Sequence, residues 1–263
     1  MYSEEHKTYL QKEKRNNILI LSTQIIIFIL FISLWQLLVY FNIINRFIFS
    51  SPFDVIKTII NLYQQGYLFN HIFITIWETT ISFTLSIIIG TLIATIMWWH
   101  KFIAKVIEPY LTILNSLPKV ALGPILIIWV GANIKSIIFM ALLISVIITI
   151  INVYNGFINT DENKIKLMKS FKATKKQIYT KLILPANLYI FINVLKLNIS
   201  MALIGVIIGE LLVSKKGIGY LIMYGSQVFN LNLVITGIFL LSIISVLMYY
   251  LVTYWEKKLI KYQ

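Results

Sequence analysis

The chain alternates long apolar runs with short lysine-rich segments, and this pattern constrains its fold more than any other feature. Several of the runs exceed the roughly 18 apolar residues that a helix needs to span a bilayer. Hydrophobic residues occupy 59% of the 263 positions, more than a water-soluble domain would bury or expose. The pattern therefore predicts an all-α, polytopic membrane protein.

Six membrane-spanning helices are expected from the lengths of these runs. We place them at residues 18–41, 71–99, 108–130, 136–154, 187–213 and 233–254. The third run contains Pro109, Pro118 and Pro124. Because proline leaves backbone groups that must find partners inside the protein, we expect this span to lie centrally in the bundle.

The positive charge is distributed as it is in membrane proteins. A net charge of +13 is compatible with nucleic-acid binding, but the lysines lie in short segments between apolar runs rather than on one folded face. With both termini in the cytoplasm, 16 of the 23 Lys and Arg residues fall on the cytoplasmic side. We therefore predict a plasma-membrane or inner-membrane protein with both ends inside.

This topology divides the chain into four parts. They are a cytoplasmic tail (1–17), the first span with an external amphipathic helix (18–69), a core of five spans (70–254) and a second cytoplasmic tail (255–263). The external helix should begin at Ser51 as its cap, with Pro52 in the first helical position and Asp54 in the first turn. We expect it to lie on the membrane surface or on the other spans.

Residues 156–185 form a long polar segment between strongly apolar ones, and they hold seven lysines against Asp161 and Glu162. Asn159 or Thr160 can cap a first short helix. The segment then turns at residues 171–173. The charge pattern fits either a docking element on the cytoplasmic side or a solvated loop that connects two spans.

A second short helix should follow this turn. Thr174 and Gln177 have the spacing of a capping box. We expect the helix to continue to Leu184 and to end at Pro185, because the residue before a proline is disfavoured in helical geometry.

Polar residues within the spans are candidates for a translocation path. In the second span Glu78 lies on one helical face, and the other polar residues of that face are Thr75, Thr79, Ser82 and Ser86. A charge inside the membrane is costly, so Glu78 should face protein or water. It either lines a path or makes a buried polar contact between helices.

The fifth span carries a second polar stripe, formed by Asn193, Lys196, Ser200 and Glu210, with Gly205 and Gly209 on the opposite face. The two glycines form a small-xxx-small pair that allows another helix to approach closely. The stripe would then face the path. Lys196 and Glu210 cannot pair, because about 21 Å of helix separates them. Lys119, beside the proline break, either attracts an anion or neutralises a helix end.

Three stretches resemble the permease subunits of binding-protein-dependent, ATP-driven importers. They are the loop motif from Lys166–Leu167–Met168 to Ile183–Leu184–Pro185, the proline-broken segment 117–124, and the run from Gly209 to Ile222. Lys166–Leu167–Met168 replaces the family's Glu-Ala-Ala, and Lys172 occupies the position of its turn glycine. A non-glycine residue in a left-handed helix end costs roughly 1 kcal/mol.

The resemblance implies a homodimeric permease with two cytoplasmic ATPase subunits and an external binding protein or lipoprotein as partners. The residues implied in ATPase coupling are Lys166, Met168, Ser170, Phe171, Lys172, Ala173, Thr174, Gln177, Ile178, Tyr179 and Pro185. No cofactor is expected on this chain, and the partner subunits would use the ATP. The resemblance is strongest to the branch that imports sulfonates, taurine and nitrate, which also includes carriers of thiamine-precursor pyrimidines.

Two other classes of protein are compatible with a polytopic chain. An ion-coupled carrier could use Glu78 and Glu210, but it usually contains an inverted repeat, and we see none. An intramembrane enzyme needs a nucleophile and a base; the three histidines are far apart and no nucleophile elbow is present. No Walker motif occurs either, so the chain is expected to be non-catalytic. With no cysteine in the sequence, no thiolate metal site is expected.

Overall fold

The structure, a computed structural model, describes residues 4–260 and is helical throughout, without strands in that range. Its long helices are α1 (Glu4–Tyr40), α4 (Leu68–Trp99), α7 (Ile134–Ile158), α11 (Leu188–Val213) and α13 (Leu231–Ile260). The shorter elements are α2 (Arg46–Phe49), α3 (Pro52–Gln64), α5 (Lys101–Ser116), η1 (Lys119–Leu122), α6 (Gly123–Val130), α8 (Glu162–Ser170), α9 (Lys175–Ile178), the π-helical η2 (Tyr179–Ile183), α10 (Leu184–Ala186) and α12 (Ile218–Gln227). The predicted all-α, multi-pass fold is confirmed.

Five helices of the described chain are long and apolar enough to cross a membrane, and a sixth span results if α5 and η1–α6 are counted together. These two pieces are bent by 90° relative to each other. The break falls at Leu117, which is extended (ψ 141°), as the residue before a proline prefers to be. The proline-broken third span is thus a bent pair of helices.

Two details of the third span were predicted wrongly. Its helix begins at Lys101 rather than near Glu108, because the extended His100 alone makes the turn from α4. It also lies at the periphery of the single chain, since Ala104 and Leu111 are the buried residues of α5. Pro118 and Pro124 fall at the bend between two helices, where the backbone groups that they free need no central position in the bundle, whereas Pro109 lies inside α5.

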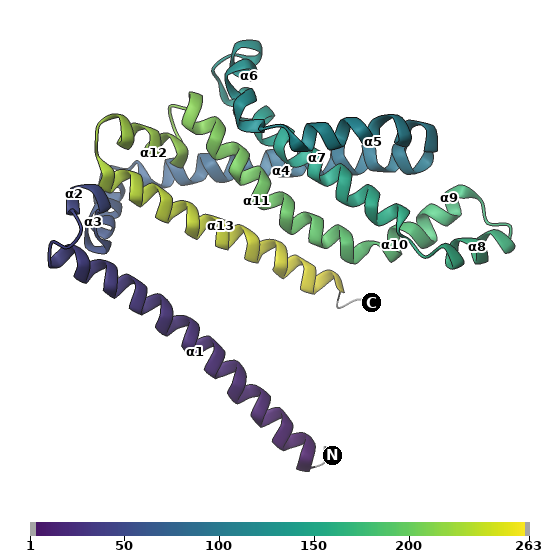
Figure 1. Ribbon diagram of the computed structural model, residues 1–263, viewed down its shortest axis with the longest axis horizontal. Coiled ribbons are helices and arrows are strands. Elements are labelled where there is room, and N and C mark those ends of the chain that lie inside the picture. Colours follow the sequence, from purple (N-terminus) through teal and green to yellow (C-terminus); the bar gives the residue numbers. More distant parts are fainter. Residues whose placement is uncertain (1–3, 261–263) are drawn as a thin grey trace.

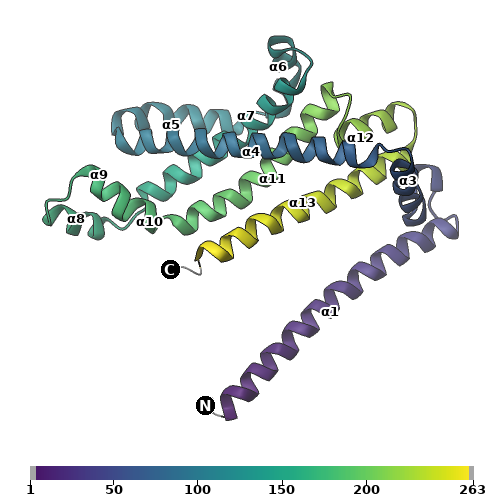
Figure 2. The same cartoon turned by 180° about the vertical axis from the view of Figure 1, so that it is seen from behind.

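Helix α7 forms the centre of the bundle, where it packs against both α4 and α11 (Figures 1 and 2). The approach is close because glycines face it. A Cβ atom on Gly209 would lie 2.9 Å from the Cα of Ile137, and one on Gly205 would overlap the backbone of Ala141. The small-xxx-small pair on α11 therefore lies where α7 approaches it most closely.

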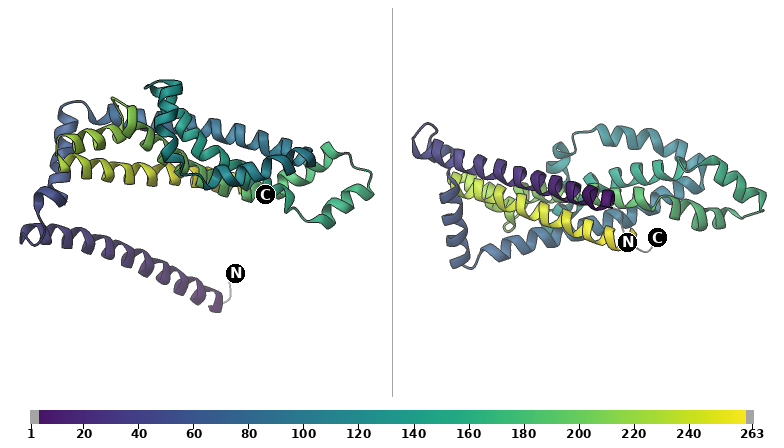
Figure 3. Two further views of the ribbon diagram at one scale, coloured as in Figure 1. Left: turned by 45° about the horizontal axis from the view of Figure 1, so that its top comes forward. Right: turned by 90° about the horizontal axis from the view of Figure 1, so that it is seen from below.

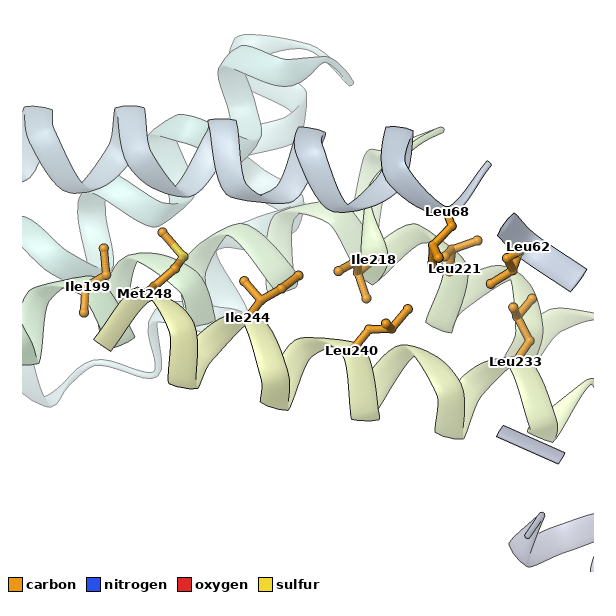
Figure 4. Packing of buried hydrophobic residues seen from close by; sticks show 9 residues of the cluster. All are labelled: Leu62, Leu68, Ile199, Ile218, Leu221, Leu233, Leu240, Ile244 and Met248. Atoms are coloured by element: carbon orange, nitrogen blue, oxygen red, sulfur yellow. The ribbon is translucent and has the colours of Figure 1, made fainter. Parts of the chain in front are cut away.

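A second core lies between α11, α12, α13 and the neighbouring ends of α3 and α4. Figure 4 shows its leucine, isoleucine and methionine side chains pointing between these helices. Its buried members are Leu62, Leu68, Ile199, Ile218, Leu221, Leu233, Leu240, Ile244 and Met248. The amphipathic helix α3 therefore rests on the other spans, through Leu62. Ser51 caps α3 as predicted, accepting the Asp54 N–H at 3.1 Å.

Helix α1 leaves this body at the corner formed by α2 and α3 and extends away from it, as the left view of Figure 3 shows most clearly. Its apolar window is not buried against the rest of the chain. The start of α1, the end of α13 and the hairpin α8–α9 all lie toward the same end of the molecule (Figure 1).

Candidate functional site

The hairpin formed by α8 and α9 extends beyond the ends of α4 and α5 in every view (Figures 1–3). Asp161 caps α8 by accepting the Asn163 N–H at 2.9 Å. The predicted caps were therefore wrong: Asn159 ends α7, and Thr160 accepts a bond from Asn187 at 2.7 Å. Three consecutive residues could each cap a helix, and the length of α7 decides which of them does.

The capping box of α9 is confirmed, with Thr174 and Gln177 bonded reciprocally. The predicted end of this helix at Pro185 is wrong. The backbone widens into the π-helical turn η2 and continues through Pro185 into α10. A π turn changes the hydrogen-bond register, so the missing proline N–H interrupts no α-helical bond there. Asn187 Nδ2 then bonds the Ile183 carbonyl at 2.8 Å.

The turn between the two helices places Lys172 in the left-handed region, with φ at 57°. The Lys172 N–H donates to the Lys169 carbonyl at 2.8 Å, and the Ala173 N–H donates to the Met168 carbonyl at 3.0 Å. This pair of bonds is the Schellman motif, in which glycine normally occupies the position of Lys172. Lys172 thus takes the conformation of the glycine that it replaces.

The predicted coupling residues divide into an outward and an inward set. The exposed set is Lys166, Ser170, Phe171, Lys172, Thr174, Gln177 and Pro185. The inward set is Met168, Ala173, Ile178 and Tyr179, which pack on a core that includes Ala94 and Phe157. The inward side chains hold the hairpin on the bundle, and the outward ones are available to a partner.

The hairpin is attached to the end of α4 by an aromatic and cationic cluster. Lys175 lies 5.7 and 5.6 Å from the ring centroids of Trp98 and Trp99, and its ammonium bonds the Trp99 carbonyl. The Tyr179 ring contacts Trp98 at 5.1 Å, and its hydroxyl lies 2.7 Å from that of Thr95. We call Thr95, Trp98, Trp99, Lys175 and Tyr179 the inner cluster.

The other end of α4 meets the start of α12. Helix α12 has no cap of its own, because Gly217 provides no side chain. Other helices cap it instead. The N–H groups of Gly217, Ile218 and Gly219 donate to His71 Nδ1 (2.9 Å), Thr75 Oγ1 (2.9 Å) and Glu210 Oε2 (2.6 Å) respectively. We call His71, Thr75 and Glu210, with Gly217 to Gly219, the outer cap.

Glu210 is fixed in this site from several directions. Besides the Gly219 N–H, it accepts the Thr75 hydroxyl at 2.7 Å. Its carboxyl also lies against the two glycines: a Cβ at Gly217 would overlap it, and one at Gly219 would lie 2.9 Å from Oε2. A carboxylate at a helix N-terminus is favoured by the helix dipole. Glu210 therefore serves as a remote cap of α12.

The two acids proposed for the translocation path, Glu78 and Glu210, lie in contact. Each is 1% exposed, and the two side chains are neighbours in the packing of α4 against α11. Within the described chain both lie inside the protein rather than on an open surface. A role of Glu78 or Glu210 in lining a path stays a prediction.

A third polar site, missed in the sequence, lies between the two ends. Asn198 of α11 is fully buried and bonds Ser86 of α4 at 2.7 Å, the Ser145 carbonyl of α7 at 3.3 Å and the Thr149 hydroxyl. It joins all three central helices. Ser86 belongs to the polar face predicted for the second span. The signal for its partner was Asn198 itself, an amide within the apolar run of the fifth span.

The other predicted path residues are not brought together in one site. Lys119 donates to the carbonyl and side-chain oxygen of Asn115 at 3.0 and 3.3 Å, so it caps the end of α5 as one of the two interpretations had it. Asn193, Lys196 and Ser200 are half-buried along α11. No cluster of three or more potential metal ligands occurs among the described residues.

Near the start of α3, Arg46 holds Asp54 with two bonds of 2.8 and 2.6 Å. This contact holds the pKa of the Asp54 carboxyl below its usual range. Asp54 also borders a hollow of about 690 Å³ between α3, α12 and α13, whose lining includes Lys57, Tyr67 and Tyr220.

The structure so far defines an all-helical, multi-pass membrane protein with a projecting basic hairpin. Comparison with protein families shows to which family of membrane proteins the chain belongs. Residues 86–261 match the family described as the binding-protein-dependent transport system inner membrane component. The match covers more than half of the sequence, and the chain belongs to this family.

Two curated relatives illustrate its range. The chain is 28% identical over 201 residues to the formylaminopyrimidine transport permease protein ThiX of Halalkalibacterium halodurans, covering 76% of this chain and 80% of the relative. It is 27% identical over 232 residues to the putative aliphatic sulfonates transport permease protein SsuC of Bacillus subtilis, covering 88% and 84%. The fold is similar to that of a chain of the MetNI methionine ABC transporter in an inward-facing form, with a TM-score of 0.64 at 16% identity, covering 72% and 94%.

Proposed function

We propose that this membrane component forms the path by which an ATP-driven importer carries a small anion of the sulfonate, taurine or nitrate type. The match to the sulfonate permease relative, which extends over 88% of the chain, carries the proposal. Two lysines within the spans, Lys119 and Lys196, would suit an anionic solute. A neutral thiamine-precursor pyrimidine is the second candidate, because the formylaminopyrimidine permease is an equally similar relative.

The energy for transport would come from two ATPase subunits that dock on residues 164–184, while an external binding protein delivers the solute. On this proposal the chain binds no cofactor and is non-catalytic, and ATP is used by its partners. The support is the projection of the hairpin beyond the bundle, together with its outward-facing set of predicted coupling residues. Because the inner cluster attaches the hairpin to α4, a movement of the ATPases would displace α4 as well.

A second copy of the chain would complete the path, and both termini would be cytoplasmic. Two observations support a homodimer. The bent pair α5–α6 exposes large apolar side chains, among them Ile128 (80%) and Trp129 (76%), and α1 lies apart from the body. The orientation is supported by the position of both chain ends on the side of the lysine-rich hairpin (Figure 1).

An ion-coupled carrier remains the competing function, because Glu78 and Glu210 are two buried acids within the spans. Glu210, however, is already engaged by Thr75 and Gly219 as a cap. A carboxyl that holds a helix in place is poorly suited to releasing and rebinding an ion in every cycle.

The test is to purify the tagged chain from detergent and identify by mass spectrometry what accompanies it. We expect a stoichiometric ATPase that is lost when residues 171–179 are replaced by a Gly/Ser linker. Phe102→Ala provides a control, since Phe102 is an equally exposed aromatic (79%) at the start of α5, outside the hairpin. Retention of the ATPase by the linker variant would contradict the docking site.

Transport measurements separate the remaining possibilities. A chain that purifies alone and moves solute in liposomes without ATP would favour the ion-coupled carrier. If the ATPase is present, binding assays on the partner binding protein with taurine and with a formylaminopyrimidine would distinguish the two solute classes.

A further inference from the structure

The tip of the hairpin contains a strained residue with no structural need for its side chain. Lys172 has a positive φ of 57°, a conformation that glycine adopts freely and that costs other residues roughly 1 kcal/mol. Its backbone bonds are those of any Schellman turn, and glycine would form them equally well. The lysine side chain makes no contribution to the turn that offsets this strain. We therefore expect the side chain to interact with another molecule.

Beside Lys172 the tip exposes apolar surface to solvent. Phe171 is 75% exposed and Leu167, one turn earlier on α8, is 57% exposed. The apolar neighbours Ile165 and Met168 instead pack toward the bundle. An exposed aromatic at a turn beyond the membrane helices is typical of a residue that fills a pocket on a partner.

The charge around this apolar tip is unbalanced. Of the two acids in the hairpin, Glu162 pairs with Lys166 at 3.3 Å and Asp161 is used as the cap of α8. Among the described residues, no carboxylate lies within salt-bridge distance of Lys164, Lys169, Lys172, Lys176 or Lys181. The hairpin therefore combines an exposed apolar tip with several lysines that have no carboxylate partner among the described residues.

We infer that the hairpin tip binds an apolar pocket rimmed by carboxylates on the ATPase subunit, with Phe171 in the pocket and Lys172 paired with a rim carboxylate. The inference rests on the proposed docking of an ATPase and adds the chemistry of the surface that receives the hairpin. Charge complementarity at the rim would guide the encounter, and the buried aromatic would supply most of the affinity.

An anionic lipid surface would also attract lysines, but the geometry favours a protein. Helices that lie on a membrane turn one apolar face toward it. Here the inward apolar residues of α8 and α9 are engaged by the bundle. The turn between α8 and α9, which begins at Phe171, lies beyond the ends of α4 and α5 (Figure 2).

Lys172→Gly tests the inference without threatening the fold, because glycine relieves the strain while it removes the charge. The full chain is co-purified with its ATPase, and the dissociation constant of the complex is measured over a range of salt concentrations. We expect Lys172→Gly to weaken binding by about tenfold and to reduce the salt dependence. Lys172→Arg, which keeps both the charge and the strain, should stay within about twofold of wild type.

Two further variants complete the comparison. Phe171→Ala should weaken binding more than Lys172→Gly does, at all salt concentrations. Lys215→Gly removes one positive charge from an exposed position on the outer side and should leave binding unchanged. A thermal unfolding midpoint for Lys172→Gly at or above that of wild type shows that any lost affinity does not come from misfolding.

Each outcome is decisive. If Lys172→Gly binds the ATPase as tightly as wild type, the charged rim is wrong, although the docking site stands. If the variant keeps the ATPase but loses binding to vesicles of phosphatidylglycerol, the lysines serve the membrane and the inference is overturned. If wild type retains no ATPase, the proposed function fails, and this inference with it.

Discussion

The two ends of α4 are held by different kinds of interaction. At the outer cap, buried and directional hydrogen bonds join His71 and Thr75 of α4, and Glu210 of α11, to the first N–H groups of α12. At the inner cluster, Trp98, Trp99 and Tyr179 meet through ring contacts and a lysine above the rings.

The difference indicates which end can move. A hydrogen bond weakens steeply when its angle departs from linearity, and a buried group left without a partner is costly. Ring contacts and cation–π contacts persist over a range of offsets and tilts. We therefore interpret the outer cap as a fixed attachment and the inner cluster as an adjustable joint between α4 and the hairpin.

The largest effect is expected from Gly217→Ala, which would break the fixed attachment. Gly217 has a φ of 101°, and a Cβ there would overlap the Glu210 carboxyl. Strain and overpacking, at about 1–3 kcal/mol each, should lower the free energy of unfolding by about 2–6 kcal/mol. The unfolding midpoint in detergent measures this change.

Gly66→Ala is the matched control. Its φ of 76° is also positive, but no atom lies within 4 Å of the added Cβ. It should therefore show the strain alone, roughly 1 kcal/mol. Equal losses for the two variants would show that Glu210 does not fill the space beside Gly217.

The next effect distinguishes the two buried acids. Glu210→Ala should cost about 3 kcal/mol, because the Gly219 N–H and the Thr75 hydroxyl lose their acceptor. Glu78→Ala, at the same 1% exposure, should cost less, since Oε2 of Glu78 has no hydrogen-bond partner in the described chain. Hydrogen exchange at residues 217–221 should rise in Glu210→Ala and much less in Glu78→Ala. The opposite ranking would make Glu78 the structural acid.

Whether a feature of the structure could be predicted from the sequence depends on how far apart in the chain its interacting residues lie. The capping box of Thr174 and Gln177 is local, so the residue spacing predicted it. The cap at Asp161 was missed by one or two positions, because Asn159 and Thr160 are also competent caps and only the length of α7 selects among them. The helix continues through Pro185 because a π turn precedes it. The rule that a helix ends before a proline does not take such a turn into account.

The outer cap and the Asn198 site could not be read from spacing, because each joins helices far apart in the chain. Glu210 was placed on a polar stripe of its own helix, but His71 and Thr75 are more than 130 residues away from the groups that they bond. The sequence identified Glu78 and Glu210 as costly intramembrane acids. That the two acids are neighbours follows from tertiary packing alone.

A smaller effect is expected at the inner cluster. Lys175→Met keeps the apolar stem but loses the cation over Trp98 and Trp99, which contributes about 0.5–1 kcal/mol. Hydrogen exchange should increase at residues 95–99 and 175–183, with no change at the outer cap. Lys176→Met, at the exposed neighbouring position, is the control and should change neither region. Increased exchange at residues 217–221 would mean that the two ends of α4 are not independent.

The smallest effect concerns the ion pair of Arg46 and Asp54. Unlike the outer cap, it has one exposed partner, because the Arg46 side chain is 62% exposed and that of Asp54 10%. The bonds from Arg46 lower the pKa of Asp54 in the folded state, so the unfolded chain binds a proton more readily. The resulting stabilisation is complete above the ordinary aspartate pKa of about 3.9 and is lost as the pH falls through the lower folded-state value.

Unfolding midpoints measured from pH 6 down to pH 3 test this, with Asp54→Asn as the control that should remove this contribution. Because solvent screens the exposed guanidinium, the decrease should be smaller than the loss caused by Glu210→Ala, and it should shrink further in high salt. A decrease that rivals the Glu210→Ala effect would show that the ion pair between α2 and α3 stabilises the fold as much as the outer cap does. In that case burial would not be what makes the outer cap more stabilising than the ion pair near it.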